Sequence, residues 1–303
     1  MLLDDIVDLV HRAAAGRDSS RPCRVYTAAS LNFLPGIATL LSSFAAHSGL
    51  ACTVVLLHHR DIPDSQLSAH NVSYLGCAAR PLRIARQRVD DRRMRLFSSF
   101  ASAHYSSAQA LMKLELLFAA EPTSNDSALR IWMDGDMLVR RPLWPVETVP
   151  RSPWRLHVST PAGGRNINSG FFALPGPAPA SAQEVLIDGL HSQAPLPSSC
   201  RLATGPNQTR VTQCDDQAVL RFFVASKLRA SVSHDDWRMN QPRDSWELGG
   251  WRAAHWMGTR KPWGGCGPFV CKQQLGDSTV VQDRLEDEWR REWRRVQVRC
   301  GVT

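Results

Sequence analysis

The order of apolar and polar positions along the chain predicts an α/β fold. In the first third, apolar runs of strand length alternate with segments whose apolar residues recur at helical spacing, which is the pattern of β-α-β units. The predicted strands lie at 23–29, 51–57, 72–77, 129–133, 155–159 and 167–174. The predicted helices lie at 33–48, 64–70, 106–120, 181–192 and 215–226. We therefore expect a sheet flanked by helices.

Two regions depart from this pattern. The stretch 80–95 carries seven arginines among few apolar residues, so we expect an exposed loop with a basic face. Near the C-terminus, Leu285, Trp289 and Trp293 recur at helical spacing among arginines, which predicts an amphipathic helix. We interpret its tryptophans as a packing face, with contact to a membrane or a partner as the alternative.

Composition favours one large domain with a tail. A chain of 303 residues with 43% hydrophobic content can bury a full α/β core. We expect an N-terminal helix and linker at 1–22, the main domain at 23–275 and the amphipathic helix at 276–303.

The charge of the chain favours anionic partners. Its formal net charge is +8 and its isoelectric point is about 9.4. A sugar nucleotide, an acidic glycan, a membrane surface and a nucleic acid all fit this charge. Nucleic acid is disfavoured because no nucleic-acid-binding module is visible in the sequence. Charge alone does not choose among the other three.

The cysteines point to disulfides rather than to zinc. Eight cysteines include no C-x-x-C, which disfavours a structural zinc site. The pairs Cys266 with Cys271 and Cys200 with Cys214 are candidates for disulfides in an oxidising compartment. Three others lie in or beside predicted strands and are interpreted as core thiols: Cys23, Cys52 and Cys77.

Glycosylation sequons favour a secretory lumen such as that of the Golgi. They begin at Asn71, Asn125 and Asn207. No apolar stretch reaches the ~20 residues that span a bilayer, and the first residues do not resemble a signal peptide. We therefore expect a soluble catalytic portion whose membrane anchor is missing from this chain, with a cytoplasmic protein as the alternative.

Two carboxylates follow the apolar run at 129–133. Asp134 and Asp136 would lie at the C-terminal edge of a sheet, where open α/β folds bind ligands. An Asp-x-Asp triplet is expected about once by chance in such a chain, and a lone histidine such as His255 is more often a core residue than a ligand. Together, however, two carboxylates and an imidazole can hold a divalent cation with positions open for diphosphate oxygens. The sequence therefore indicates a metal-diphosphate site.

The segment His255-x-x-Gly258-x-x-Lys261-Pro262-Trp263 is specific enough to indicate a family. It resembles the signature of glycosyltransferase family 8, which includes glycogenin and bacterial lipopolysaccharide galactosyltransferases, and the similarity runs over residues 24–264. The resemblance implies the GT-A fold, a Rossmann-like mixed sheet flanked by helices. It also implies a retaining transferase that uses a UDP-sugar donor and Mn²⁺, with Mg²⁺ as the alternative metal.

The resemblance assigns the metal and phosphate residues. It implies that Asp134, Asp136 and His255 bind Mn²⁺, and that the metal binds the diphosphate of the donor. Lys261 would contact the phosphates directly, and Gly258 belongs to the same signature. Lys261 is thus expected to act in catalysis by stabilising the leaving group.

The resemblance also assigns residues for the rest of the donor. Thr27, Ala29 and Phe33 resemble the first strand and turn of the family, where uracil is held. Phe33 stands at the position of an aromatic residue that stacks on the base. Lys113 is similar to a basic residue on a helix that approaches the donor phosphates or sugar.

The sugar pocket is implied in the same way. Asn168-Ser169-Gly170 resembles the strand that lines it, and Asp216 with Gln217 is similar to an acidic-amide pair near the anomeric carbon. A plain turn, and a carboxylate favoured at a helix N-terminus, are the structural alternatives for these two motifs. The segment 159–165 lacks the aspartate that several family members carry there, so the sugar is not specified.

The predicted function is therefore transfer of a hexosyl unit, with retention, from a UDP-sugar to a glycan, protein or lipid acceptor. The alternatives are a non-catalytic GT-A pseudoenzyme that binds nucleotide sugars or glycans, and an inverting GT-A transferase. We expect loops such as 80–95 and 193–213 to choose the acceptor. The oligomeric state is left open, with a homodimer among the alternatives.

Overall fold

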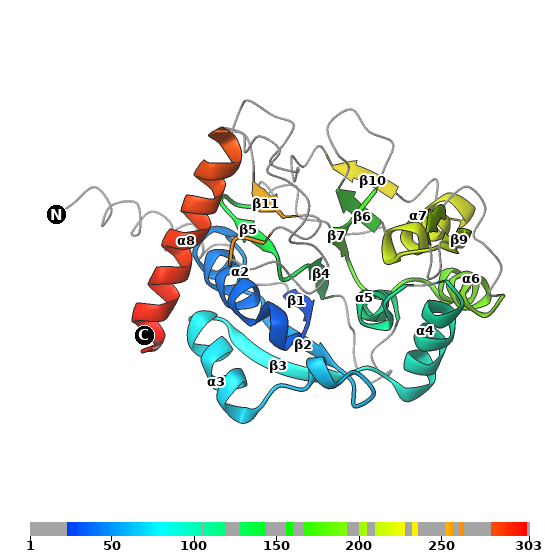
Figure 1. Ribbon diagram of the computed structural model, residues 1–303, viewed down its shortest axis with the longest axis horizontal. Helices are drawn as coiled ribbons and strands as arrows, with labels where there is room; N and C mark the ends of the chain where they lie inside the picture. The colour runs from blue at the N-terminus through cyan, green and yellow to red at the C-terminus, as the bar shows by residue number, and fades with distance from the viewer. Residues whose placement is uncertain are drawn as a thin grey trace.

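The computed structural model shows a central sheet with helices on both faces (Figure 1). The described residues are 23–104, 106–118, 128–143, 156–159, 167–192, 200–204, 210–227, 232–235, 252–256, 261–263 and 280–301. The main sheet has seven strands in the order β10-β6-β7-β4-β1-β2-β3. The α/β fold predicted from the sequence is confirmed.

One side of the sheet is parallel. Strands β1 (Cys23–Ala28), β2 (Thr53–His58) and β3 (Arg83–Arg88) run in the same direction, and β4 (Leu129–Met133) lies parallel to β1 on its other flank. Helices α2 (Leu34–His47) and α3 (Ala69–Ala78) make the connections between the first three strands. Parallel neighbours require such crossover connections.

The other side of the sheet is mixed. Strand β7 (Asn168–Leu174) is antiparallel to both β4 and β6 (Leu156–Ser159), and β10 (Val232–Asp235) runs parallel to β6 at the edge. A separate ribbon pairs β5 (Met137–Val139) with β11 (Ala253–His255), and a hairpin pairs β8 (Arg201–Thr204) with β9 (Arg210–Gln213).

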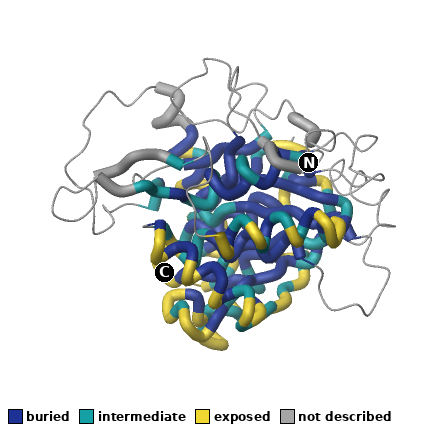
Figure 2. The backbone as a smooth tube through the Cα atoms, turned by 90° about the vertical axis from the view of Figure 1, so that its right-hand side faces the viewer, coloured by how far each residue is buried: buried dark blue, intermediate teal, exposed yellow. Residues whose placement is uncertain are grey.

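Helices cover both faces because strand side chains alternate between them. Val54 and Leu56 of β2 pack in the apolar cluster of α2 and α3, whereas Val55 and Leu57 pack on the opposite face. The elements on that opposite face are α4 (Asp91–Ala103), α5 (Ala108–Leu111), the 3₁₀ segment η3 (Met112–Leu117), α6 (Ala180–His191) and α7 (Asp216–Lys227). Figure 2 shows buried residues gathered in the interior of the described part and exposed residues along its rim.

The apolar run 72–77, predicted as a strand, lies in helix α3 instead. Ser68 caps this helix, since its Oγ accepts a hydrogen bond from the backbone N–H of Asn71 at 3.1 Å. Periodicity in so short a run does not separate a strand from a buried helix. The buried side chains of α3 share one helical face: Tyr74, Leu75 and Ala78.

The prediction of a loop at 80–95 is also wrong. The segment forms the edge strand β3 and the start of α4. An edge strand tolerates exposed arginines because only part of it needs to be buried, and charges there discourage pairing with other chains. Asp90 caps α4 by accepting hydrogen bonds from the backbone N–H groups of Arg92 and Arg93.

Two further helix predictions change in detail. The helix predicted at 64–70 is reduced to the 3₁₀ turn η2 (Pro63–Ser65). The segment 106–120 is helical up to Leu117, but it consists of α5 followed by η3 rather than one helix. A further 3₁₀ turn, η1 (Leu31–Phe33), precedes α2.

All six cysteines in the described part of the chain form disulfides. The bond predicted between Cys200 and Cys214 is confirmed, whereas Cys266 and Cys271 lie outside the described residues. The other bonds are Cys23–Cys52 and Cys77–Cys300.

The interpretation of Cys23, Cys52 and Cys77 as core thiols is therefore wrong. The register of β1 and β2 pairs Arg24 with Thr53, so the residues before them lie side by side. Cys77 meets a residue from the far end of the chain, and no local pattern carries that information.

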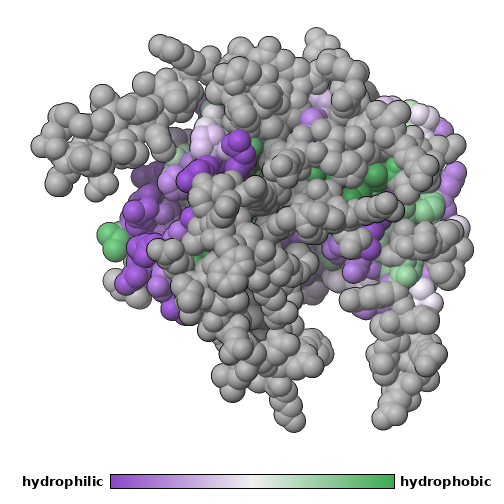
Figure 3. All heavy atoms as spheres, turned by 90° about the horizontal axis from the view of Figure 1, so that it is seen from above, coloured by the Kyte–Doolittle hydropathy of each residue, from purple (hydrophilic) through white to green (hydrophobic). Residues whose placement is uncertain are grey.

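The C-terminal helix α8 (Val280–Cys300) lies within the segment predicted for it and is amphipathic. Figure 3, seen from above, shows hydrophilic atoms gathered on the left, the side on which α8 lies in Figure 1. Among the described residues, we find no helix that combines the length and the apolar character needed to cross a bilayer. The predicted segment 1–22 is outside the described residues, and the domain division remains a prediction.

Candidate active site

A cavity of about 390 Å³ opens at the carboxyl end of β4, between β1 and β7. Strand direction changes here, since β7 runs antiparallel to β4, and ligands of open α/β sheets bind at such edges. Side chains from several elements line the cavity, and they include most of the predicted site residues: Thr27, Phe33, Lys113, Asp134, Asp136, Asn168, Asp216, Gln217 and His255.

The structure brings the three predicted metal ligands together. His255 ends β11, which pairs with β5 in a register that sets His255 opposite Met137, the residue after Asp136. Its Nε2 lies 3.1 Å from Asp136 Oδ1 and 3.7 Å from Asp134 Oδ2. Ligand atoms of all three side chains lie within 4.8 Å of one another. Backbone hydrogen bonds fix the main chain of both aspartates: the Asp134 N–H donates to the carbonyl oxygen of Gly170, and the Trp256 N–H donates to the carbonyl oxygen of Asp136.

Gly170 explains part of the Asn-Ser-Gly motif. A Cβ atom at this position would lie 2.2 Å from Cε1 of His255, so the imidazole can occupy its place only because residue 170 has no side chain. Asn168 also contacts the ring, with Nδ2 3.2 Å from His255 Nδ1. Its Oδ1 accepts a hydrogen bond from the Gly170 N–H. The motif therefore orients the ring of His255.

Lys113 joins two of the three carboxylates that line the cavity. Its Nζ lies 3.0 Å from Asp134 Oδ1, 2.5 Å from Asp216 Oδ2 and 3.3 Å from the carbonyl oxygen of Ser169. Burial opposes the charged form of Lys113, but attraction by Asp134 and Asp216 outweighs burial and raises its pKa. The lysine therefore remains an ammonium group.

Asp216 is held in a similar way. Burial raises the pKa of Asp216. The ammonium of Lys113 and a hydrogen bond from the Ser169 hydroxyl, at 2.6 Å, lower it by more than burial raises it, so the net shift is downward. Asp216 is thus a carboxylate whose Oδ2 is already engaged by Lys113 and Ser169.

Lys261 is not part of the cavity lining, but it contacts one of the predicted metal ligands. Its ammonium contacts Asp136 and donates a hydrogen bond to the carbonyl oxygen of Trp256 at 2.6 Å. Burial of Asp136 raises its pKa, but His255 and Lys261 outweigh this effect and lower it. Lys261 also lies over the ring of Phe33, with its Nζ 5.6 Å from the ring centre.

One predicted residue, Ala29, falls elsewhere, and another, Gly258, is not described. Ala29 does not line the cavity, whereas its neighbour Ala28 does. The backbone groups of Ala29 are engaged by Leu57 and by the side chain of Gln109. Gly258 lies outside the described residues.

Sequence reasoning missed Trp132 and the hydroxyl of Ser169. The indole Nε1–H of Trp132 donates to Asp134 Oδ1 at 2.8 Å, and Lys113 Nζ lies 5.6 Å from the centre of its ring. Trp132 stands two residues before Asp134 in an extended segment, so the two side chains point the same way. That spacing was a usable signal for Trp132, whereas nothing local pairs Ser169 with Asp216.

The donor set suits a divalent cation. Three carboxylates, Asp134, Asp136 and Asp216, face two ammonium groups, so these charges leave an excess of negative charge. Asp136 Oδ1 is buried, and no described residue donates a hydrogen bond of good geometry to it. Buried carboxylate oxygens require such partners or a metal, and carboxylate with imidazole is a common ligand set.

Comparison with solved structures decides the fold. A galactosyltransferase, LgtC, whose crystal structure holds donor and acceptor sugar analogues, matches with a TM-score of 0.54 over 90% of this chain and 95% of its own, at 14% identity. The chain has the GT-A fold. Two more glycosyltransferases with this fold match as well, and the identities of all three are too low to show more than the fold.

One of these two is GlyE of Streptococcus pneumoniae, with a TM-score of 0.54 at 13% identity, and the match covers 91% of this chain and 62% of GlyE. The other is the bifunctional enzyme WbbM, with a TM-score of 0.51 at 14% identity, covering 82% of this chain and 48% of WbbM. No protein-family model matches the chain, and no curated protein matches it significantly. The GT-A fold expected from the signature is confirmed.

Proposed function

We propose that this chain is a retaining glycosyltransferase that moves a hexosyl unit from a UDP-sugar to an acceptor hydroxyl, in a reaction that depends on Mn²⁺. The observation that carries the proposal is the meeting of Asp134, Asp136 and His255 at the ligand edge of a GT-A sheet, with Lys113 and Lys261 beside them. Carboxylates, an imidazole and ammonium groups at one place are the chemistry that a metal-bound diphosphate needs.

Asp134, Asp136 and His255 would hold the metal. When bound, Mn²⁺ would act as a Lewis acid that stabilises the charge developing on the departing diphosphate. Lys261 would then turn from Asp136 toward the phosphates. A point charge placed where negative charge develops is worth more in the transition state than in the ground state.

The part of the cavity lined by Thr27 and Phe33 suits the nucleoside. Phe33 offers an aromatic face for uracil. The hydroxyl of Thr27 is buried at the cavity wall and has no hydrogen-bond partner among the described residues, so a ligand could supply one.

In the reaction we propose, the bond between the anomeric carbon and the diphosphate oxygen breaks. The acceptor oxygen forms a new bond to the same face of that carbon, and the acceptor proton passes to the departing phosphate oxygen. The products are the glycosylated acceptor and UDP. Gln217, and Asp216 as a fixed negative charge, would support the oxocarbenium-like centre.

The two alternatives are less well supported. An inverting enzyme needs a free carboxylate as general base, but Asp216 is paired with Lys113 and Ser169 and its pKa is lowered. A pseudoenzyme would usually have lost a metal ligand, whereas this chain keeps Asp134, Asp136 and His255.

We also propose that the chain works in an oxidising compartment, for which the Golgi lumen is our candidate. Three disulfides support this, because such bonds are rare in reducing compartments. Asn71, the one sequon asparagine in the described residues, lies in α3 and is half-buried.

The test is calorimetric titration of UDP with and without Mn²⁺, followed by a screen of UDP-sugars for metal-dependent hydrolysis. Wild-type protein should bind UDP only weakly without the metal. Asp136→Asn should lose the metal-dependent part, because it removes a ligand charge. The matched control is Asp215→Asn, which removes the same charge next to the site; Asp215 caps α7 and is not in the cavity lining. Equal metal-dependent affinity in both variants would overturn the proposal.

A further inference from the structure

Helix α8 packs directly behind the β5–β11 ribbon, which carries His255 and begins next to Asp136. Its residues Leu285 and Trp289 are buried in one cluster with Leu138 of β5, Ala254 of β11 and Trp256. In Figure 1, α8 runs along the left side of the molecule beside α2 and this ribbon. Helix α8 therefore supports the candidate site from behind.

An aromatic row leads from α8 to the cavity. The ring of Trp289 lies 5.6 Å from that of Trp263, and Trp263 meets Phe33 edge to face at 5.4 Å. Phe33 lines the cavity, and Lys261 stands two residues before Trp263 with its ammonium near the Phe33 ring. The row thus connects a residue of α8 to the two groups proposed to hold base and phosphate.

Trp263 is wedged between α8 and the N-terminal end of α2. A Cβ atom added at Gly36 would lie 2.5 Å from ring atoms of Trp263 and 2.5 Å from the backbone oxygen of Gly135. Trp263 therefore has no room to move toward Gly36 of α2, and Trp289 is its ring neighbour on α8. Removing the indole of Trp289 would leave space into which the ring of Trp263 could shift.

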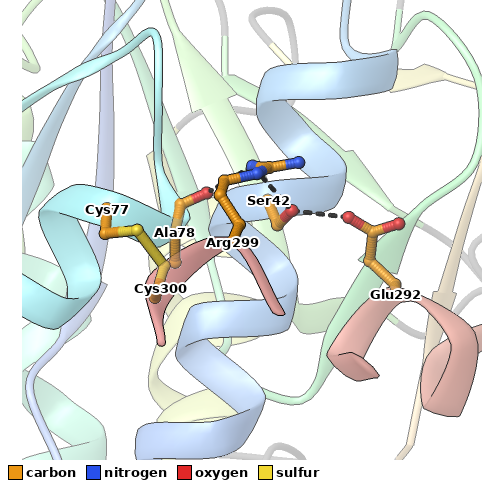
Figure 4. The surroundings of a disulfide bond; sticks show 6 residues. All are labelled: Ser42, Cys77, Ala78, Glu292, Arg299 and Cys300. Atoms are coloured by element: carbon orange, nitrogen blue, oxygen red, sulfur yellow. Dashed lines mark hydrogen bonds between the residues drawn. A yellow bond between two sulfur atoms is a disulfide. The ribbon is translucent and has the colours of Figure 1, made fainter. Parts of the chain in front are cut away.

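Polar contacts and a disulfide hold α8 in this position. Glu288 forms a two-point ion pair with Arg140, at 2.6 and 2.9 Å, directly after β5. Glu292 accepts a hydrogen bond from Ser42 of α2 at 2.5 Å. The disulfide Cys77–Cys300 ties the end of α8 to α3, as Figure 4 shows together with the Ser42–Glu292 bond.

We propose that α8 braces the donor site and that Trp289 is the positioning residue through which it holds Trp263, and with it Lys261 and Phe33. The proposal rests on the proposed function for its binding readout, but the brace itself is a property of the protein without ligand. It assigns a role in the site to a helix that contributes no residue to the cavity lining.

Trp293 supplies a matched control. It lies one turn further along α8, stacks on Trp289 with ring centres 6.0 Å apart and meets Tyr74 of α3 edge to face at 6.3 Å. Trp289→Leu and Trp293→Leu both remove an indole from the same helix. Both should therefore lower the melting temperature by a few degrees, roughly 2–6 °C.

Only Trp289→Leu should change the site. Without ligand, hydrogen exchange in peptides covering 252–263 should be faster in Trp289→Leu than in wild type or Trp293→Leu.

With Mn²⁺, affinity for UDP should fall about tenfold in Trp289→Leu, since small displacements of positioned groups carry large costs, and should change less than twofold in Trp293→Leu. In a Lys261→Ala background, Trp289→Leu should weaken UDP binding by less than in wild type, because both changes act on the same contact. Trp289→Phe keeps an aromatic face and should restore most of the affinity; it also serves if Trp289→Leu fails to fold.

Equal exchange rates and equal UDP affinities in the two leucine variants would overturn the brace while leaving the proposed function intact. Fully additive effects of Trp289→Leu and Lys261→Ala would overturn the assigned route through Lys261. If wild-type protein binds no UDP with Mn²⁺ but exchange still separates the two variants, the proposed function fails and the brace stands.

Discussion

Between the sheet and helices α2 and α3, Ile37, Val54 and Leu75 are fully buried among other apolar side chains. At the carboxyl end of β4, Lys113 and Asp136 are almost as deeply buried, with exposures of 4% and 6%, yet both carry charge. Apolar burial stabilises the fold by about 25 cal/mol per Å². Burial of charges costs several kcal/mol per ion, which pairing only partly repays.

The comparison separates what holds the protein together from what it is built to do. An apolar replacement of the charged cluster would often be at least as stable, so stability does not explain why the cluster exists. The cluster is explained by its position at the edge of the sheet where ligands bind. Changes in the cluster should therefore affect chemistry first, and changes in the apolar layers or their cross-links should affect stability first.

The largest effect expected from breaking the charged cluster is on catalysis. Lys261→Ala should lower kcat by roughly 10²–10³, the scale of losing one electrostatic stabiliser, while donor affinity falls much less. Steady-state kinetics with the donor identified in the hydrolysis screen measures both. A rise in KM with unchanged kcat would show that Lys261 only binds the donor.

Gln217→Ala tests the residue proposed to act on the sugar rather than on the departing diphosphate. Gln217 lines the cavity beside Asp216, and we propose that it acts on the sugar, so we expect UDP affinity to persist while transfer and donor hydrolysis both slow. Weakened binding of UDP itself in calorimetry would contradict this assignment.

Within the cluster, Lys113→Met should be strongly destabilising. It leaves Asp134 and Asp216 close together without the ammonium between them. The free energy of unfolding, measured with urea, should therefore fall by about 3–5 kcal/mol. Adding Asp216→Asn removes the unpaired charge and should recover part of that loss. A cost below about 1 kcal/mol for Lys113→Met would mean that the pair is not buried as described.

Cutting the cross-link between α3 and α8 should cost somewhat less stability. The double variant Cys77→Ser, Cys300→Ser opens a link across 223 residues, and its free energy of unfolding should fall by about 2–4 kcal/mol. At 25 °C, where α8 stays packed, UDP affinity should be nearly unchanged. Thermal unfolding and calorimetry check the two statements, and an unchanged melting temperature would contradict the first.

The smallest effect concerns one polar atom inside an apolar layer. Burial raises the pKa of Tyr74 to about 12, from 10.0, and its hydroxyl has no hydrogen-bond partner among the described residues. The folded protein thus holds the phenol proton more tightly than the unfolded chain. That contribution to stability is complete below pH 10.0 and is lost as the pH rises through about 12.

Tyr74→Phe removes the buried hydroxyl and should stabilise the protein by about 1 kcal/mol at neutral pH. It should also flatten the loss of stability between pH 10.0 and about 12. Urea unfolding across this range measures both effects. The same alkaline slope in wild type and variant would assign the titration to another group.

Local patterns were enough for much of the fold. Strands β1, β2 and β4 and helices α2 and α8 follow from periodicity, because each buries one continuous face or both. The same patterns misread α3 and β3: the run at 72–77 is too short to show its period, and an edge strand does not need the apolar residues that identify a buried one.

The candidate site divides in the same way. The sequence by itself marked Asp134 and Asp136, because a strand end predicts where carboxylates gather, and its signature marked His255 and Lys261. Only the tertiary structure placed Lys113 between Asp134 and Asp216, seated the His255 ring on Gly170 and joined Cys77 to Cys300. These contacts join segments far apart in the chain, and strand order and helix packing bring such segments together. A periodic pattern reports which face of an element is buried, but not which element covers that face.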